Sequence, residues 1–142
     1  MAKDLFHNTV KEALEKDGWT ITHDPYELRM EALHLFEAKM QIDLGAERLI
    51  AAEKGHEKIA VEVKSLLGPS LIYDLHNLVG QFIDYQIGLE AQEPDRVLYV
   101  AVPKIQYERL ADQELFKRIV KRAGLKVIVF EPETKVLAKW QK

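Results

Sequence analysis

The sequence predicts a mixed α/β fold in which helices flank both sides of one mixed β-sheet. Segments with apolar residues at every second position predict strands, and segments with apolar residues three and four positions apart predict helices. The strands before residue 65 follow one another closely and should pair antiparallel, whereas the later strands are separated by helices and should run parallel through right-handed crossovers. The predicted order of elements is αβββαβαββ.

The composition is that of one globular domain spanning residues 1–142, with 47% hydrophobic and 30% charged residues. The chain has no cysteine, which excludes disulfides and thiolate metal sites and suits a cytoplasmic location. It shows no signal-peptide pattern and no apolar run long enough to span a membrane. Because the net charge is −3, we expect any DNA contact to depend on a local basic patch or a partner.

The first third of the chain combines clear and ambiguous segments. Residues 3–17 carry one apolar stripe and predict a helix that ends at Gly18. A strand should follow and end at Asp24-Pro25. Residues 26–40 are compatible with a helix, a pair of strands or an irregular excursion.

A hairpin and a long helix occupy the middle of the chain. The hairpin should turn at Lys54-Gly55-His56, and its second strand reads KIAVEVKS. After the loop LLGPS, residues 71–90 predict a helix. Its apolar stripe consists of Leu71, Leu75, Leu78, Phe82 and Leu89.

The last third predicts two buried strands, a helix between them and an edge strand. RVLYVAVP is apolar on both faces, as in a central strand covered on both sides. Residues 104–123 predict one amphipathic helix that ends at Gly124, followed by the strand KVIVF and the edge strand VLAKW. The apolar residues of that edge strand, Val136, Leu137 and Trp140, either cover the protein's own sheet or pair with a second chain in a homodimer.

Glu62 and Lys64 are the first candidates for catalysis. Their spacing on a strand places the carboxylate and the ammonium group over the same face. A carboxylate there suits a hard divalent cation, and the lysine can orient a water molecule and offset charge on a phosphate. The alternative is an ordinary solvated strand face.

Asp43 precedes the hairpin and can return to the neighbourhood of Glu62. The two carboxylates and the main-chain carbonyl of Val63 would form an oxygen-only site for Mg²⁺ or Mn²⁺. Glu12 is a further candidate for an outer metal ligand. The alternatives are a turn residue for Asp43, which lies close before Gly45, and a solvated surface carboxylate for Glu12.

Gln81 and Tyr85 lie four residues apart and therefore share one face of the long helix. Their amide and phenol groups can bind a phosphate backbone or position a base. The alternative is an amphipathic border in which the tyrosine covers the core.

The order of these features resembles that in the PD-(D/E)xK nucleases. Asp43 comes first, followed by the hairpin with its E-x-K strand and then the helix with Q-x-x-x-Y. The resemblance implies the restriction-endonuclease-like fold with its αβββαβ core. It also implies Asp43, Glu62 and Lys64 as catalytic residues, Gln81 and Tyr85 as DNA-binding residues, and a 5′-phosphate product. The chain departs from the motif at Ile42, where the family name has proline.

A resemblance to the XisH family, the fdxN-element excision controlling factors of cyanobacteria, covers nearly the whole chain. Five blocks carry it: FHNTVKEALEKDGWTITHDP, IDLGAERLIAAEKG, KIAVEVKS, GQFIDY and LYVAVP. It implies a role in programmed DNA rearrangement, an XisI-like partner protein and a separate recombinase that cuts and joins the DNA.

The sequence is compatible with two functions. The first is a Mg²⁺-dependent DNA endonuclease or exonuclease that uses the five residues named above. The second is a non-catalytic accessory protein that binds DNA or an XisI-like partner and controls a separate recombinase. A basic segment, Lys117, Arg118, Lys121 and Arg122, is either a phosphate-binding patch or a solvated helix face.

Overall fold

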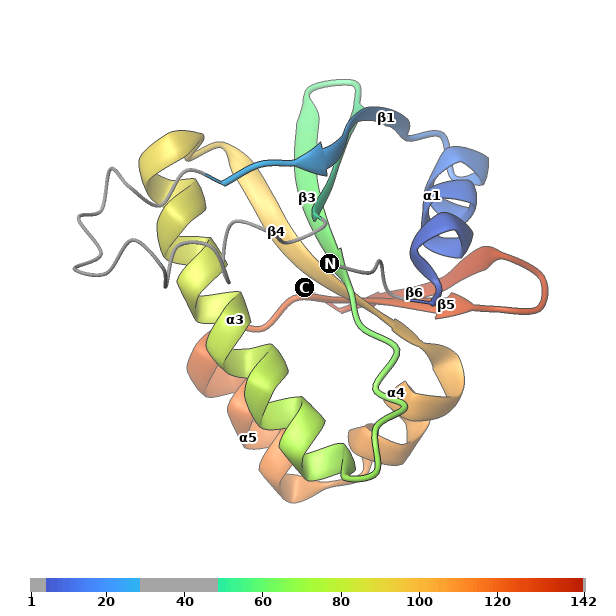
Figure 1. The fold of residues 1–142 in the computed structure, drawn as a ribbon, viewed down its shortest axis with the longest axis vertical. Coiled ribbons are helices and arrows are strands. Elements are labelled where there is room, and N and C mark those ends of the chain that lie inside the picture. Colours follow the sequence, from blue (N-terminus) through green and yellow to red (C-terminus); the bar gives the residue numbers. More distant parts are fainter. Residues whose placement is uncertain (1–4, 29–48, 142) are drawn as a thin grey trace.

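The computed structural model describes residues 5–28 and 49–141, which build a six-stranded sheet with helices on both faces (Figure 1). The segment 26–40, for which the sequence allowed several structures, lies outside the described residues from residue 29 onward. The elements follow one another in the order α1 (His7–Lys16), β1 (Thr20–Tyr26), β2 (Leu49–Lys54), β3 (Glu57–Val63), α3 (Leu71–Gln92), β4 (Arg96–Pro103), α4 (Lys104–Ala111), α5 (Glu114–Ala123), β5 (Val127–Glu131) and β6 (Val136–Gln141).

The strands lie in the sheet in the same order as in the sequence, from β1 to β6. The pairs β1–β2, β2–β3 and β5–β6 are antiparallel, and the pairs β3–β4 and β4–β5 are parallel. This confirms the predicted mixed α/β sheet and the position of β6 at its edge. No helix in the described part of the chain is long and apolar enough to cross a membrane.

The prediction of one helix over residues 104–123 was wrong, because the chain forms two helices, α4 and α5. Gln113 has an extended backbone, with φ −81° and ψ 126°, and its amide donates to the carbonyl of Leu110 at 2.9 Å. Leu110 and Phe116 both reach the same core cluster. Six positions on a straight helix would point these side chains in different directions, since one turn takes 3.6 residues.

Each face of the sheet has its own apolar core. On one face, Ile59, Val61 and Val63 of β3 pack in a cluster with residues of α1. On the other face, Ala60 belongs to the cluster formed with α3, α4 and α5. Because strand side chains alternate, Glu62 and Lys64 point toward the face that α3 covers.

Candidate functional site

The candidate site lies where β3 ends. Glu62 is buried, with 4% of its surface exposed, and its Oε2 lies 3.5 Å from Nζ of Lys64. The Lys64 amide donates to the carbonyl of Ala101 at 2.9 Å, which extends the pairing with β4 by one residue. The predicted alternative of a fully solvated strand face therefore does not describe Glu62, although about a third of the Lys64 side chain is exposed (31%).

The loop after Lys64 is held by side chains from two helices. In Figure 1 it runs from the end of β3 past α4 to the start of α3. Gln106 of α4 donates from its Nε2 to the carbonyl of Leu66, and Arg109 donates to the Oε1 of Gln106 at 3.1 Å. Asp74 of α3 accepts a hydrogen bond from the amide of Gly68 at 2.9 Å. These contacts fix the chain directly after the lysine.

The Asp74 carboxylate approaches Gly68 closely at this point of the loop. A Cβ atom there would lie 2.7 Å from Oδ2 of Asp74, well inside normal contact distance. The absence of a side chain therefore allows the Asp74 carboxylate to reach the loop backbone.

Ser70 caps the amino end of α3, and its hydroxyl accepts a hydrogen bond from the amide of Tyr73 at 3.2 Å. Such a cap satisfies one of the free amides of the first turn. Two turns further on, Gln81 is half-buried, and its buried Oε1 accepts no hydrogen bond from any described residue. Tyr85 is completely buried within the core on the same side of the sheet.

A polar opening of about 290 Å³ lies beside the E-x-K strand. Lys64 and Gln81 both line it, and so do Asp74 and Asn77. The structure thus brings the lysine from β3 and the amide from α3 to one accessible place. Tyr85 has no exposed surface and does not reach the opening.

Of the expected metal ligands, the described residues contain Glu62, Val63 and Glu12, and Asp43 lies outside them. Val63 is the last residue of β3, so its carbonyl lies at the strand end beside Glu62. Hard oxygen donors of this kind fit Mg²⁺ or Mn²⁺. Within residues 5–28 and 49–141, no three acidic or histidine side chains form a group that could hold a metal ion.

Glu12 is not brought to this place. It lies on α1, which packs on the opposite face of the sheet, and its carboxylate oxygens are 3.5 Å and 3.8 Å from Nζ of Lys16 and Lys135. The structure therefore favours the alternative prediction of a surface carboxylate, here engaged in ion pairs.

Three polar residues at this place were not among the predicted site residues: Asp74, Asn77 and Gln106. Gln106 had no separate signal in the sequence, because its burial on α4 depends on the packing of the folded chain. Asp74 lies in the first turn of α3, where a carboxylate is commonly only a helix-stabilising residue, so its loop contact had no separate signal.

The comparisons with known proteins agree with this fold. The family model for XisH protein matches residues 1–138. The chain is 39% identical to an XisH family protein from Nostoc punctiforme, with a TM-score of 0.82, and the match covers 98% of this chain and 100% of the other. It is 40% identical to an fdxN element excision controlling factor protein from Anabaena variabilis, with a TM-score of 0.84 and coverage of 99% and 100%. The comparison with curated proteins found no match.

Proposed function

This chain belongs to the XisH family, and we propose that it acts in the controlled excision of a DNA element through a nuclease-type site centred on Glu62 and Lys64. The observation that carries the proposal is the pairing of the buried Glu62 with Lys64 at the end of β3, beside an opening lined by Gln81. Lys64 has no other carboxylate within ion-pair distance among the described residues. Among residues 5–28 and 49–141, its ammonium group therefore pairs with Glu62 alone.

In this proposal the site cleaves a phosphodiester bond, as in PD-(D/E)xK nucleases. Glu62, the carbonyl of Val63 and Asp43 would hold Mg²⁺ or Mn²⁺, which supplies positive charge at the scissile phosphate and lowers the pKa of water. Lys64 orients the attacking water and offsets the negative charge that develops in the transition state.

The two helix residues receive different roles. Gln81 reaches the opening and has amide donors and an acceptor for the DNA strand. Tyr85 is completely buried, so we assign it a supporting role in holding α3 against the sheet on the side of Glu62.

A cleavage assay tests this proposal. Purified full-length protein is incubated with Mg²⁺ or Mn²⁺ and linear, nicked or branched DNA. We expect Glu62→Gln and Lys64→Ala to lower the rate by about 100-fold or more, the usual effect of removing one group that stabilises transition-state charge. Lys58→Ala is the matched control, because Lys58 lies on the same strand and pairs with Glu93 and Asp95. Equal and negligible cleavage by the wild type and Lys64→Ala on every substrate would exclude the nuclease proposal.

Metal binding is measured separately. Calorimetric titration of Mn²⁺ into the wild type should show binding that Glu62→Gln abolishes. Lys58→Ala should bind like the wild type. Binding that is unchanged in Glu62→Gln would remove the carboxylate from the metal site.

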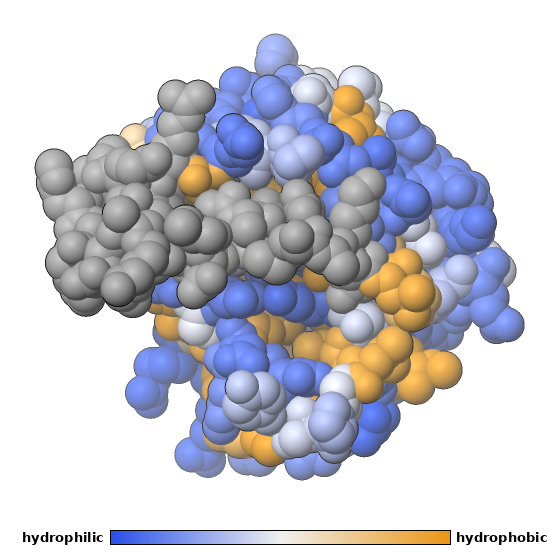
Figure 2. All heavy atoms as spheres, viewed as in Figure 1, coloured by the Kyte–Doolittle hydropathy of each residue, from blue (hydrophilic) through white to orange (hydrophobic). Residues whose placement is uncertain are grey.

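A second candidate function is that of an accessory protein that controls a separate recombinase through an XisI-like partner. The net charge of −3 supports it, because DNA phosphates are repelled by an acidic protein. Apolar surface over the loop after β3 and over α4 also supports it (Figure 2), where Leu67 and Ile105 are 57% and 71% exposed. Loss of partner binding in Ile105→Ser, with cleavage absent in the wild type, would favour this function over the nuclease.

A further inference from the structure

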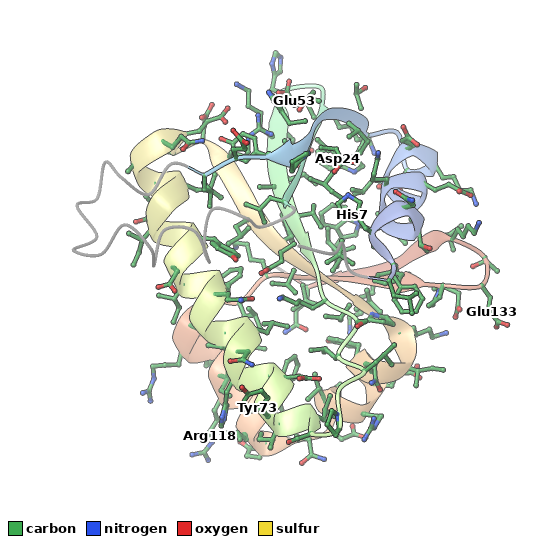
Figure 3. The ribbon with its side chains drawn as sticks, viewed as in Figure 1. His7, Asp24, Glu53, Tyr73, Arg118 and Glu133 are labelled. Carbon is green, nitrogen blue, oxygen red and sulfur yellow. The ribbon has the colours of Figure 1, made fainter. Side chains whose placement is uncertain are left out.

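A basic groove lies along α5 and the turn that follows it, on the same side of the sheet as Glu62. Its volume is about 780 Å³, and its charged lining consists of Lys117, Arg118, Lys121 and Lys126 with one carboxylate, Glu114. Figure 3 shows the labelled Arg118 pointing outward from α5. Four cations and one anion thus line a groove on a protein whose net charge is −3.

The positive charge of this groove is largely unneutralised. Arg118 pairs with Glu114 at 3.0 Å. Among the described residues, Lys117, Lys121 and Lys126 have no carboxylate within 4.0 Å. Most lysines elsewhere in the described chain do have such a partner: Lys11, Lys16, Lys54, Lys58, Lys64 and Lys135.

The fold, and not the helix alone, gathers these charges. Lys117 and Lys121 are four residues apart and share one face of α5. Gly124 ends the helix with φ +65°, a left-handed conformation that suits glycine, and turns the chain so that Lys126 lines the same groove. Val120 and Leu125 provide the apolar part of the lining.

Stabilisation of the helix dipole does not account for the whole set. Cations in the last turn of a helix interact favourably with its carboxyl end, which explains Lys121 and Arg122. The effect falls off within that turn, so it does not explain Lys117, and Lys126 lies outside the helix. The positions of these two lysines are therefore not explained by the helix dipole, and they add positive charge to the groove.

We infer that this groove binds the phosphodiester backbone of double-stranded DNA. Lysines act as flexible point charges for phosphate groups, and the described residues that line the groove include no aromatic or amide side chain that would read bases. The contact therefore positions the duplex without selecting its sequence. The inference rests on the proposed DNA function, but it requires binding and not cleavage, so the two can fail independently.

The test is fluorescence anisotropy with a labelled duplex of about 20 base pairs, without divalent cations, over a range of salt concentrations. The groove variant is the triple change Lys117→Gln, Lys121→Gln and Lys126→Gln. The matched control is Lys16→Gln, Lys54→Gln and Lys135→Gln, which removes the same charge from lysines that are 46%, 46% and 49% exposed and lie away from the groove.

We expect the groove variant to bind at least about 10-fold more weakly, and the slope of log K against log salt to fall by about 0.9 for each phosphate that the variant no longer neutralises. The control should change binding by less than about 2-fold. Because binding is measured without divalent cations, the result does not depend on whether the wild type cleaves DNA. Circular dichroism checks folding, and the single exposed change Lys117→Gln, with a smaller reduction in binding, replaces the triple variant if that variant does not fold.

Two results would overturn the inference. The first is an equal reduction of binding in the groove variant and the control, which would make net charge the cause. The second is no measurable binding by the wild type at about 50 mM salt, where electrostatic binding to phosphates is strong.

Discussion

Arg96 and Lys64 lie on the same side of the sheet, at opposite ends of the paired strands β3 and β4, and their surroundings differ. Arg96 donates to Glu93 at 2.8 Å and 3.2 Å, to Glu53 at 3.2 Å and to the carbonyl of Ile59 at 2.9 Å. Its side chain is 2% exposed. Lys64 has one ion pair in the described structure, at 3.5 Å, and its side chain is 31% exposed.

The difference separates a structural cation from one that is available to a ligand. The guanidinium of Arg96 uses all three nitrogens within the protein and also lies over the ring of Tyr26, 5.0 Å from its centroid. Lys64 keeps donors beside an opening, next to a buried carboxylate. Perturbation of Arg96 should therefore affect stability, whereas perturbation of Lys64 should affect the chemistry of the site.

The largest expected effect comes from removing each cation in turn. Arg96→Ala should lower the free energy of unfolding by about 3 kcal/mol, because the buried guanidinium is lost together with its hydrogen bonds to the half-buried Glu93 and Glu53 and to the carbonyl of Ile59. Lys64→Ala should lower it less, by about 1–2 kcal/mol, because a single ion pair at 3.5 Å is lost, although its partner Glu62 is buried. Urea unfolding followed by circular dichroism measures both. A destabilisation in Lys64→Ala as large as that in Arg96→Ala would abolish the distinction.

The second-largest expected effect is a loss of stability at acid pH that originates at Glu93, a partner of Arg96. Hydrogen bonds from Arg96 lower the pKa of Glu93 from 4.5 to about 2, aided by the hydrogen bond from Tyr26 and opposed by partial burial. A carboxylate with a lowered pKa stabilises the fold above its unfolded pKa, and this stability is lost as the pH falls from about 4.5 to about 2.

The corresponding variant is Glu93→Gln. It should remove up to about 3 kcal/mol of stability at neutral pH and flatten the loss of stability below about pH 4.5. Unfolding is measured at several pH values, with Glu57→Gln as a control at an exposed carboxylate. If the acid dependence of Glu93→Gln matched that of the wild type, Glu93 would not be its source.

A smaller change in stability is expected for Gln106, which holds the loop after Lys64. Gln106→Ala should cost about 1–2 kcal/mol, because the buried carbonyl of Leu66 loses its hydrogen bond. It should also speed amide hydrogen exchange in residues 65–68 and lower any cleavage activity, since the loop after Lys64 is then held less firmly. Gln113→Ala is the control, because the Gln113 side chain makes no capping hydrogen bond. Unchanged exchange in this loop would show that Gln106 does not position it.

The smallest effect is expected for the exposed pair of Arg118 and Glu114 on α5, whose side chains are 78% and 69% exposed. A double-mutant cycle with Glu114→Gln and Arg118→Gln should give a coupling energy of less than about 0.5 kcal/mol. A coupling above about 1 kcal/mol would mean that the pair is a structural contact. Glu114→Gln alone should strengthen DNA binding slightly, because it removes the carboxylate that lines the groove.

The spacing of apolar residues along the sequence predicted most of the helices and strands. The alternation in KIAVEVKS was sufficient to place Glu62 and Lys64 together on one face of a strand, since that periodicity is a property of the extended backbone. The turn at Gly55 and the end of α5 at Gly124 were also predictable. Both positions have a positive φ, which glycine adopts readily, so the glycine itself marks them in the sequence. The break between α4 and α5 was not predictable, since no glycine or proline marks it. The break allows Leu110 and Phe116 to reach the same core cluster.

The candidate site was predictable only in part. Spacing along β3 and α3 was enough to choose Glu62, Lys64, Gln81 and Tyr85, because i, i+2 and i, i+4 neighbours are fixed by local geometry. Their burial came from tertiary contacts: β3 is covered by α3 on one face and α1 on the other, so Glu62 is buried, Gln81 reaches the opening and Glu12 lies on the opposite side. The same applies to the basic groove, where the helix period aligns Lys117 with Lys121 but only the turn of the folded chain at Gly124 adds Lys126. Backbone geometry acts over a few residues and is encoded locally, whereas the enclosure of a charge depends on which distant segments pack against it.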